Sequence, residues 1–476
     1  MNKIILSLLL MLSALALALT NQGKPQTQTK PIVFIHVTVI DTTGAPAKPN
    51  MTVVITGDRI TAIGKTGKVS VPDGAQVVDA KGKFLIPGLW DMHTHGSPAP
   101  QGFLPLLIVN GITGVRFMGG DHELIRQRRK AIENGTLLGP RIVMVAPVVD
   151  GSKLLRSFAV VITNENEARQ AVDSLKNQGD FLKILDTVPR EAYFAFADEA
   201  RRQKISFVGH LPVYVSAAEA SDAGQKSIEH LNGILRSCSA SEAQLRRDII
   251  DAITKPGVRA GDVLLYRAGT YGKTILETYD EKKADQLFAR FRNNRTWVCP
   301  TLVVHRSFAF PEAFASDPGL KYMPLSRIEA WKSDWRRQAL TPEVVAEQKK
   351  VFDKYLEVVR AMRHAGVELL AGSDVGVPYI IPGFSLHDEL ALLVQAGLTP
   401  MEALQSATIK PAKFLGLSDS LGTVEKGKLA DLVLLEANPL EDIHNTQKIN
   451  AVVVNGKFIS KSELEAMLAN VEANKK

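Results

Sequence analysis

The sequence has few cysteines and no long apolar run beyond its first twenty residues. Only two cysteines, Cys238 and Cys299, occur among 476 residues. Two cysteines do not make the disulfide framework of a small secreted scaffold. Cys299 lies in an apolar, strand-like stretch, which favours a buried free thiol. Because no second apolar run follows the N-terminal one, the sequence predicts no further membrane span.

Strong charge of either sign is also missing. Lys and Arg number 57 against 50 Asp and Glu, which gives a net charge of +7. The only short basic cluster is RQRRK at 126–130, in a helix-like segment where a solvated face is expected. We therefore expect a small-molecule substrate and no nucleic-acid partner. With 45% hydrophobic and 22% charged residues, the chain has the composition of a globular protein with a large core.

The N-terminal stretch MNKIILSLLLMLSALALALT has the pattern of a secretory signal peptide over residues 1–20. Lys3 precedes an apolar run over 4–19, and small residues close this run. The run is shorter than the roughly 20 residues that a membrane span needs, so a retained anchor is the less favoured alternative. We expect the chain to be exported to a periplasmic or extracellular location, with no stable membrane span after cleavage.

The remaining sequence changes character twice. Residues 31–83 contain short alternating strands with turns, and strands return at 418–460. Between them, residues 84–417 contain eight short apolar runs, each followed by an amphipathic helix-like segment. This alternation predicts a parallel α/β sheet closed into a (β/α)8 TIM barrel, with a small flanking β-sandwich formed by the two terminal segments. An open doubly wound sheet is less favoured, because no Gly-rich nucleotide turn follows the first strand.

Polar residues gather where the predicted barrel strands end. GLWDMHTHG places His93 and His95 two residues apart, so both side chains point to one face of the first strand. His210, His230 and Asp374 follow the fifth, sixth and eighth strands. A single histidine at a strand end is usually structural, but the C-terminal ends of barrel strands converge on one pocket. Together these residues predict a metal site.

Lys183 lies within the apolar fourth strand, FLKILD. An inward-facing lysine is costly there as a bare cation, and costlier beside metal ions. Carboxylation of its amine by carbon dioxide would remove this cost and create an anionic group able to bridge two metals. An edge lysine whose amine reaches water is the simpler alternative.

This ordered set resembles the amidohydrolase superfamily. PGLWDMHTHG, SIEHLNG and AGSDVG are similar to its imidazolonepropionase-related branch, which includes metal-dependent prolidase-like dipeptidases, and GKLADLVLL resembles the β-unit of that family. The resemblance implies a buried metal and a second metal, bridged by carboxylated Lys183. Their remaining ligands would be His93, His95 and Asp374 for the first, and His210 and His230 for the second. Zinc suits these ligands best among divalent ions.

The resemblance also implies an activity. A metal-activated hydroxide would cleave an amide or peptide-like carbon–nitrogen bond in a small dipeptide or N-acyl amino acid, with Asp374 as the catalytic proton acceptor. A lactonase or phosphotriesterase on the same binuclear site stays open, as does a mononuclear deaminase or imidazolonepropionase. Deaminases usually carry a glutamate shortly after the strand-five histidine, and Leu211 and Pro212 follow His210 here. A non-catalytic scaffold is disfavoured, because all six ligand positions are filled.

Substrate-binding residues are weakly encoded. Arg156, Tyr214 and His305 lie on predicted loops near the strand ends, and an arginine there would clasp a substrate carboxylate. Prolidase-like relatives often carry His-Ala-Tyr-Gly after strand five, whereas Tyr214 lies two residues further on than that tyrosine would. The sequence leaves open whether the chain forms a homo-oligomer.

Overall fold

The computed structural model describes residues 30–96, 103–153, 159–258 and 271–475. The predicted signal peptide over 1–20 and the candidate Arg156 lie outside these ranges. Among the helices in the described ranges, none combines the length and the apolar character needed to cross a bilayer.

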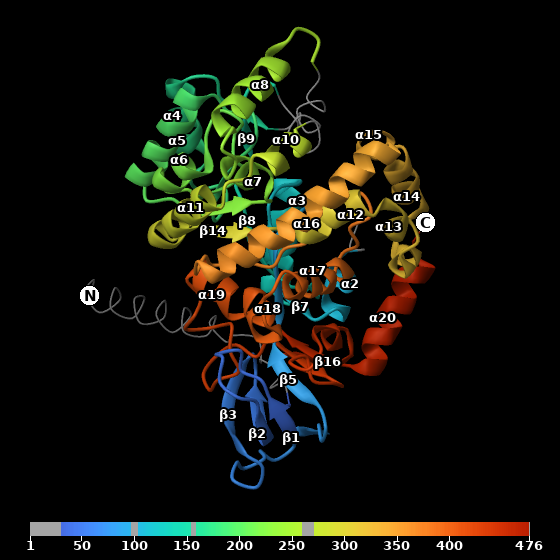
Figure 1. Ribbon diagram of the computed structural model, residues 1–476. Helices are drawn as coiled ribbons and strands as arrows, with labels where there is room; N and C mark the ends of the chain where they lie inside the picture. Colours follow the sequence, from blue (N-terminus) through green and yellow to red (C-terminus); the bar gives the residue numbers. More distant parts are fainter. Residues whose placement is uncertain (1–29, 97–102, 154–158, 259–270, 476) are drawn as a thin grey trace, which may run out of the picture.

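One mixed sheet combines strands from the N-terminal and C-terminal segments of the described chain, in the lower part of Figure 1. Strand β15 pairs antiparallel with β5, which joins the C-terminal strands to the N-terminal ones. Phe34, Leu85 and Leu434 pack in the core of this sheet and are nearly inaccessible to solvent. The order along the sheet is β17-β16-β15-β5-β1-β2-β3, with β4 paired to β1. The strands are β1 (Ile32–Val39), β2 (Lys48–Thr56), β3 (Arg59–Lys65), β4 (Gln76–Asp79), β5 (Phe84–Pro87), β15 (Leu432–Leu435), β16 (Ile449–Val454) and β17 (Lys457–Ser460).

The passage from this sheet into the α/β body lies at Gly88. Residues 84–87 are predicted as part of the barrel segment. They form strand β5, which pairs with β1 and β15 and so belongs to the mixed sheet. A Cβ atom at Gly88 would lie 2.0 Å from Thr113 Oγ1, so only glycine allows the two backbones to approach this closely. The first strand of the α/β body, β6 (Leu89–Thr94), begins at the next residue.

The α/β body is built on parallel strands. Parallel bridges between Val145 and Phe181 and between Val298 and Leu369 connect the sheets, and Met92 N–H donates to Ala371 O at 2.9 Å. The arrangement is a TIM-barrel-like α/β fold, as the sequence pattern predicts. One sheet contains β6, β7 (Ile112–Phe117) and β8 (Arg141–Met144); the other contains β9 (Val149–Asp150), β10 (Val160–Val161), β11 (Leu182–Ile184), β12 (Phe207–Gly209), β13 (Ser227–Glu229) and β14 (Trp297–Cys299).

The eighth predicted strand, at 368–376, is not a continuous strand. It contributes isolated bridges at Leu369 and Val375 instead. The backbone leaves the extended conformation at Asp374, whose φ is 57°, and again at Gly376, whose φ is 126°. A ladder therefore cannot continue through the residue that the sequence analysis places at the centre of the site.

Helices cover the parallel strands, and the long helix α16 runs across the body in Figure 1. Several begin at a polar capping residue: Asp121 accepts from Leu124 N–H, and Ser216 forms a reciprocal capping box with Glu219. The sequence analysis does not anticipate the last helix, α20, which packs its Leu464 in a cluster with Ile108. The helices are α2 (Phe103–Val109), α3 (His122–Glu133), α4 (Glu165–Leu175), α5 (Arg190–Arg202), α6 (Ala217–Asp222), α7 (Asn232–Ser237), α8 (Glu242–Thr254), α10 (Gly272–Glu277), α11 (Glu281–Asn294), α12 (Leu302–Ala309), α13 (Pro311–Ala315), η1 (Pro318–Tyr322), α14 (Leu325–Lys332), α15 (Trp335–Gln338), α16 (Pro342–His364), α17 (Phe384–Gln395), α18 (Pro400–Ser406), α19 (Ile409–Leu415), η2 (Ile443–Gln447) and α20 (Lys461–Ala473).

The parallel strands bury both apolar and charged side chains. Trp90, Met92 and Cys299 belong to one apolar cluster, while Arg116 and Lys183 are among the largest fully buried side chains. Both cysteines are buried and free, as predicted for Cys299. Polar groups at this depth need partners, which are found at the strand ends.

The mixed sheet should depend on its apolar core. Replacing Leu434 with alanine should lower the free energy of unfolding by about 2–5 kcal/mol, because the buried side chain leaves a cavity. Val77→Ala, at a 49% exposed position in β4, is the matched control and should change it by less than about 0.5 kcal/mol. Urea unfolding measures both; equal losses would contradict the assignment of this core.

Candidate metal centre

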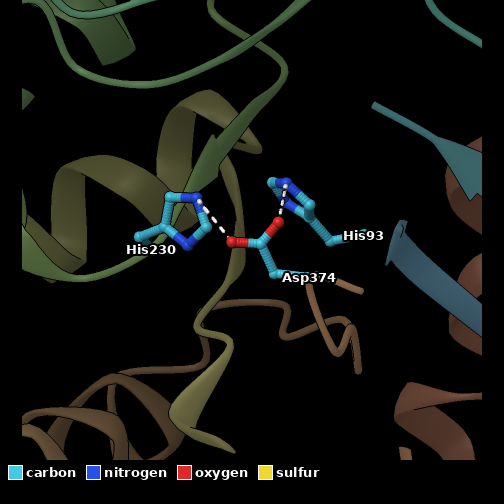
Figure 2. Close-up of side chains that lie close together, drawn as sticks. All are labelled: His93, His230 and Asp374. Carbon is cyan, nitrogen blue, oxygen red and sulfur yellow. Dashed lines mark ion pairs between the residues drawn. The ribbon is translucent and has the colours of Figure 1, made fainter. Parts of the chain in front are cut away.

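Asp374 lies between two imidazoles that come from separate strands. Figure 2 shows its carboxylate between His93, on β6, and His230, which directly follows β13. Oδ1 is 3.4 Å from His93 Nε2, and Oδ2 is 3.8 Å from His230 Nε2. One donor atom from each of the three residues lies within 4.8 Å of the others. The three form a candidate ligand group for a divalent metal ion.

The other predicted ligands surround this group. His95 Nε2 is 3.1 Å from Asp374 Oδ1. The His210 ring centroid lies 5.0 Å from that of His230. Lys183 is buried on β11, and its Nζ donates to Met118 O at 2.7 Å. His93 and His95 thus lie beside one carboxylate oxygen of Asp374, and His230 beside the other.

Each of three histidines uses its Nδ1 nitrogen for a hydrogen bond, which turns Nε2 away from that partner. His93 Nδ1 is 2.9 Å from Glu229 Oε2. His210 Nδ1 lies 3.0 Å from both carboxylate oxygens of Asp186. His230 Nδ1 is 2.6 Å from Oγ1 of Thr301. Partners of this kind fix the tautomer and the ring orientation of metal-ligating histidines.

Arg116 holds Glu229 in place. Its Nη2 donates to both carboxylate oxygens, at 2.8 and 2.9 Å, and its Nε donates to Met92 O at 2.6 Å. Nη1 donates to Ser227 Oγ at 3.0 Å. Both side chains of the ion pair are fully buried, so each charge depends on the other for compensation. The pair connects β7 and β13 to His93 on β6.

The protonation states suit metal binding. Burial lowers the pKa of His93 well below its usual value, and the charge of Lys183 lowers it further. Burial also lowers the pKa of His210 to about 3 and that of His230 to about 4. Burial alone would raise the pKa of Asp374, but the neighbouring His93 helps to hold it well below its usual range. At neutral pH, neutral imidazoles therefore surround an ionised carboxylate, as metal ligation requires.

Within the candidate metal centre, a buried ring nitrogen of His93 has no hydrogen-bond partner among the described residues. Among the described residues, His93 Nε2 has no hydrogen bond, because its 3.4 Å approach to Asp374 does not have the geometry of one. A metal ion would satisfy this nitrogen. A second cluster, His93 with Glu229 and Cys299, suits a metal less well. Arg116 occupies Glu229 there, and burial raises the pKa of the Cys299 thiol well above its usual range, which disfavours the thiolate.

The backbone at the centre is strained. His230, Thr301 and Asp374 have φ values of 66°, 47° and 57°, in the left-handed region that non-glycine residues rarely adopt. Such strain persists only where the surrounding structure enforces it, and it concentrates at functional sites. No sequence pattern signals these conformations.

The predicted substrate-binding residues have different surroundings. The His305 ring packs on Tyr355 with centroids 4.3 Å apart, and Tyr355 OH donates to Asn232, two residues after His230. Tyr214 instead lines a surface pocket of about 470 Å³ with Arg190 and other residues of α5, α6 and α8. Tyr355 and Asn232 thus connect His305 to the segment that follows His230, whereas Tyr214 lies on the surface pocket.

Sequence reasoning missed the residues that orient the histidines. Glu229 and Asp186 are buried acidic residues at the ends of short apolar strands. An acidic residue that ends an apolar run, as in SIE and FLKILD, is a sequence signal that would have identified them. Arg116, inside the apolar strand sequence GVRFM, carries the same kind of signal as Lys183. Thr301 carries none, because only the folded chain brings it to His230.

Comparisons with known proteins show which sequences the chain is similar to. A profile of the amidohydrolase family matches residues 324–459. Ochratoxinase from Aspergillus niger is 33% identical over 153 residues, which span 31% of this chain and only 31% of the ochratoxinase. Imidazolonepropionase from Pseudomonas putida is 24% identical over 80% of this chain and 86% of its own length. The chain thus spans less than a third of the length of ochratoxinase and most of the length of imidazolonepropionase.

Solved structures share the fold. Bottromycin amidohydrolase has a TM-score of 0.74 and 24% identity, and the match covers 96% of this chain and 95% of that chain. A Xaa-Pro dipeptidase with bound methionine in its active site has a TM-score of 0.64 and 22% identity, covering 90% and 100%. At this level of identity, the likeness concerns the fold.

Replacing Glu229 with methionine should affect both binding and stability. Zinc affinity should fall about 10- to 100-fold, because His93 loses the acceptor that orients it. The free energy of unfolding of the metal-free chain should fall by about 3–5 kcal/mol, because Arg116 is left unpaired. The double variant Arg116→Met/Glu229→Met should recover stability but not affinity. Chelator competition and urea unfolding measure the two effects; wild-type zinc affinity in Glu229→Met would refute this role.

Proposed function

Because the chain belongs to the amidohydrolase superfamily, we propose that it hydrolyses an amide or peptide-like carbon–nitrogen bond with two divalent metal ions. One observation carries the proposal: the Asp374 carboxylate lies between imidazoles whose other nitrogen is already hydrogen-bonded. A carboxylate surrounded by neutral imidazoles at the ends of parallel strands is suited to holding metal ions.

The two ions would divide the ligands between them. His93, His95 and Asp374 would hold the buried ion, and His210 and His230 the second. Lys183, once carboxylated, would bridge them, and its burial beside the histidines supports this part of the proposal. We also propose that the body is a closed (β/α)8 barrel flanked by a β-sandwich from the two terminal segments. The parallel bridges between neighbouring strands support its closure.

When bound, the two ions would supply an activated water and polarise the carbonyl of the substrate. Asp374 would accept a proton from the attacking water and pass it to the leaving amine. Its pKa lies well below the usual range, because His93 and the neighbouring histidines together outweigh the effect of burial, so Asp374 is ionised at neutral pH, the form that coordinates a metal ion. Glu229 and Asp186 would keep His93 and His210 in the required orientation.

For the substrate we propose a small dipeptide or N-acyl amino acid. The similar solved structures include a Xaa-Pro dipeptidase and a bottromycin amidohydrolase, which supports an amide or peptide-like bond. The long alignment with imidazolonepropionase favours a second candidate, a mononuclear enzyme of that type. Metal content of the purified chain separates the two candidates: about two ions per chain supports the first, and one ion supports the second.

Asp374→Asn should lower kcat by about 10²- to 10⁴-fold while leaving metal bound, because the amide cannot accept the proton. A hydrolysis screen over dipeptides, N-acyl amino acids, lactones and phosphotriesters should first identify the substrate. Asp198→Asn, at an exposed carboxylate, is the control and should keep wild-type activity. If Asp374→Asn turns over at the wild-type rate, Asp374 is not the proton acceptor.

We further propose export of the chain to a periplasmic or extracellular location, with residues 1–20 removed as a signal peptide. The lysine followed by an apolar run supports this. Mass spectrometry of the chain, expressed with its full N-terminus, should find a mature product that lacks about the first twenty residues. A product that retains residues 1–20 would contradict it.

A further inference from the structure

The residue that orients His230 has an unusual backbone conformation. Thr301 follows β14 and directly precedes helix α12, with φ 47° and ψ 50°. It is fully buried, and a β-branched side chain is poorly accommodated in the left-handed region. This conformation brings Oγ1 to 2.6 Å from His230 Nδ1.

The Thr301 hydroxyl does not cap helix α12, although a threonine directly before a helix usually does so. At this position the hydroxyl ordinarily accepts a hydrogen bond from an N–H of the first helical turn. Thr301 makes no such side-chain bond. Its hydroxyl is engaged with His230 instead, so the first turn of α12 needs another acceptor.

That acceptor comes from a different helix. Glu389, on α17, is fully buried, and its Oε2 accepts from Val303 N–H at 2.8 Å. Burial raises the pKa of Glu389 to about 8, so the group is mainly an uncharged carboxylic acid at neutral pH. The Glu389 carboxyl thus takes over the capping role that Thr301 gives up.

We propose that Thr301 and Glu389 are positioning residues for His230. The Thr301 hydroxyl fixes the imidazole with Nε2 toward Asp374, and the Glu389 carboxyl holds the strained turn that presents this hydroxyl. The inference rests on the proposed function, because it assigns His230 to a metal.

His230 thereby differs from the other two oriented histidines. His93 and His210 are bonded to the carboxylates of Glu229 and Asp186, whereas His230 is bonded to a neutral hydroxyl. A carboxylate partner raises the basicity of a histidine ligand, and a hydroxyl does so less. The ion held by His230 should therefore be the more weakly bound of the two.

Zinc binding to the metal-free full chain, measured by competition with a chromophoric chelator, tests the proposal. Thr301→Val keeps the shape but removes the hydroxyl, and should weaken the lower-affinity site about 10- to 100-fold. Thr301→Ser keeps the hydroxyl and should stay within about threefold of wild type. Glu389→Leu should weaken the same site, although the hydrogen bond that Glu389 accepts comes from Val303 N–H and not from a histidine. Glu389→Gln should retain most of the affinity through its amide oxygen.

The chain offers a matched control. Thr446 Oγ1 lies 2.9 Å from Nδ1 of another buried histidine, His387, outside the candidate metal centre. Thr446→Val should shift the thermal midpoint of unfolding without changing either zinc affinity. This variant shows how much the loss of a buried threonine–histidine hydrogen bond changes thermal stability when no proposed metal ligand is involved.

The outcomes separate this inference from the proposed function. Wild-type zinc affinity in Thr301→Val overturns the inference, and so does an equal loss in Thr301→Ser and Thr301→Val. A Glu389→Leu variant that lowers only the thermal midpoint shows that Glu389 is purely structural. Loss of the weaker zinc site in Thr301→Val, in a chain that hydrolyses no amide, upholds the inference and refutes the proposed activity. A wild-type chain that binds no zinc refutes both.

Discussion

The buried ion pair between Arg116 and Glu229 joins three strands within the α/β body. Neither charge has access to water, so the strands that carry them cannot separate without leaving a charge uncompensated. The pair also sets the orientation of His93, through the contact of its Nδ1 with Glu229. The interaction that fixes the interior of the body therefore fixes the first ligand of the candidate metal centre.

The positions of the ligands follow from the sequence because they depend on strand ends. Four histidines and one aspartate fall where parallel strands finish, and the fold brings those ends together. The orientation of each imidazole does not follow in the same way. It is set by contacts such as Thr301 with His230, which are 71 residues apart and are created only by folding. Residues 84–87 are predicted as part of the barrel segment but pair with β1 and β15 in the mixed sheet, because strand pairing rather than hydrophobic pattern decides which sheet β5 joins.

Backbone strain at the candidate metal centre is a second feature that a sequence pattern does not reveal. The eighth predicted strand ends in bridges alone, because Asp374 turns into the left-handed region just where its carboxylate must point between two imidazoles. The segment before this turn is closely packed. A Cβ atom at Gly372 would lie 2.6 Å from Cys299 Sγ and 2.7 Å from His93 N, so glycine allows the segment to lie against β6 and β14. A regular strand would be more stable locally, but it would not direct the Asp374 carboxylate into the same position.

The proposed hydrolysis requires two metal ions, one held with Asp374 and the other held by His210 and His230. Anomalous diffraction from crystals of the zinc-loaded chain, collected on both sides of the zinc absorption edge, tests this most directly. We expect two anomalous peaks about 3.5–4 Å apart, one beside His93 and His95 and the other beside His210 and His230. A single peak, or peaks that lie away from these histidines, would contradict it.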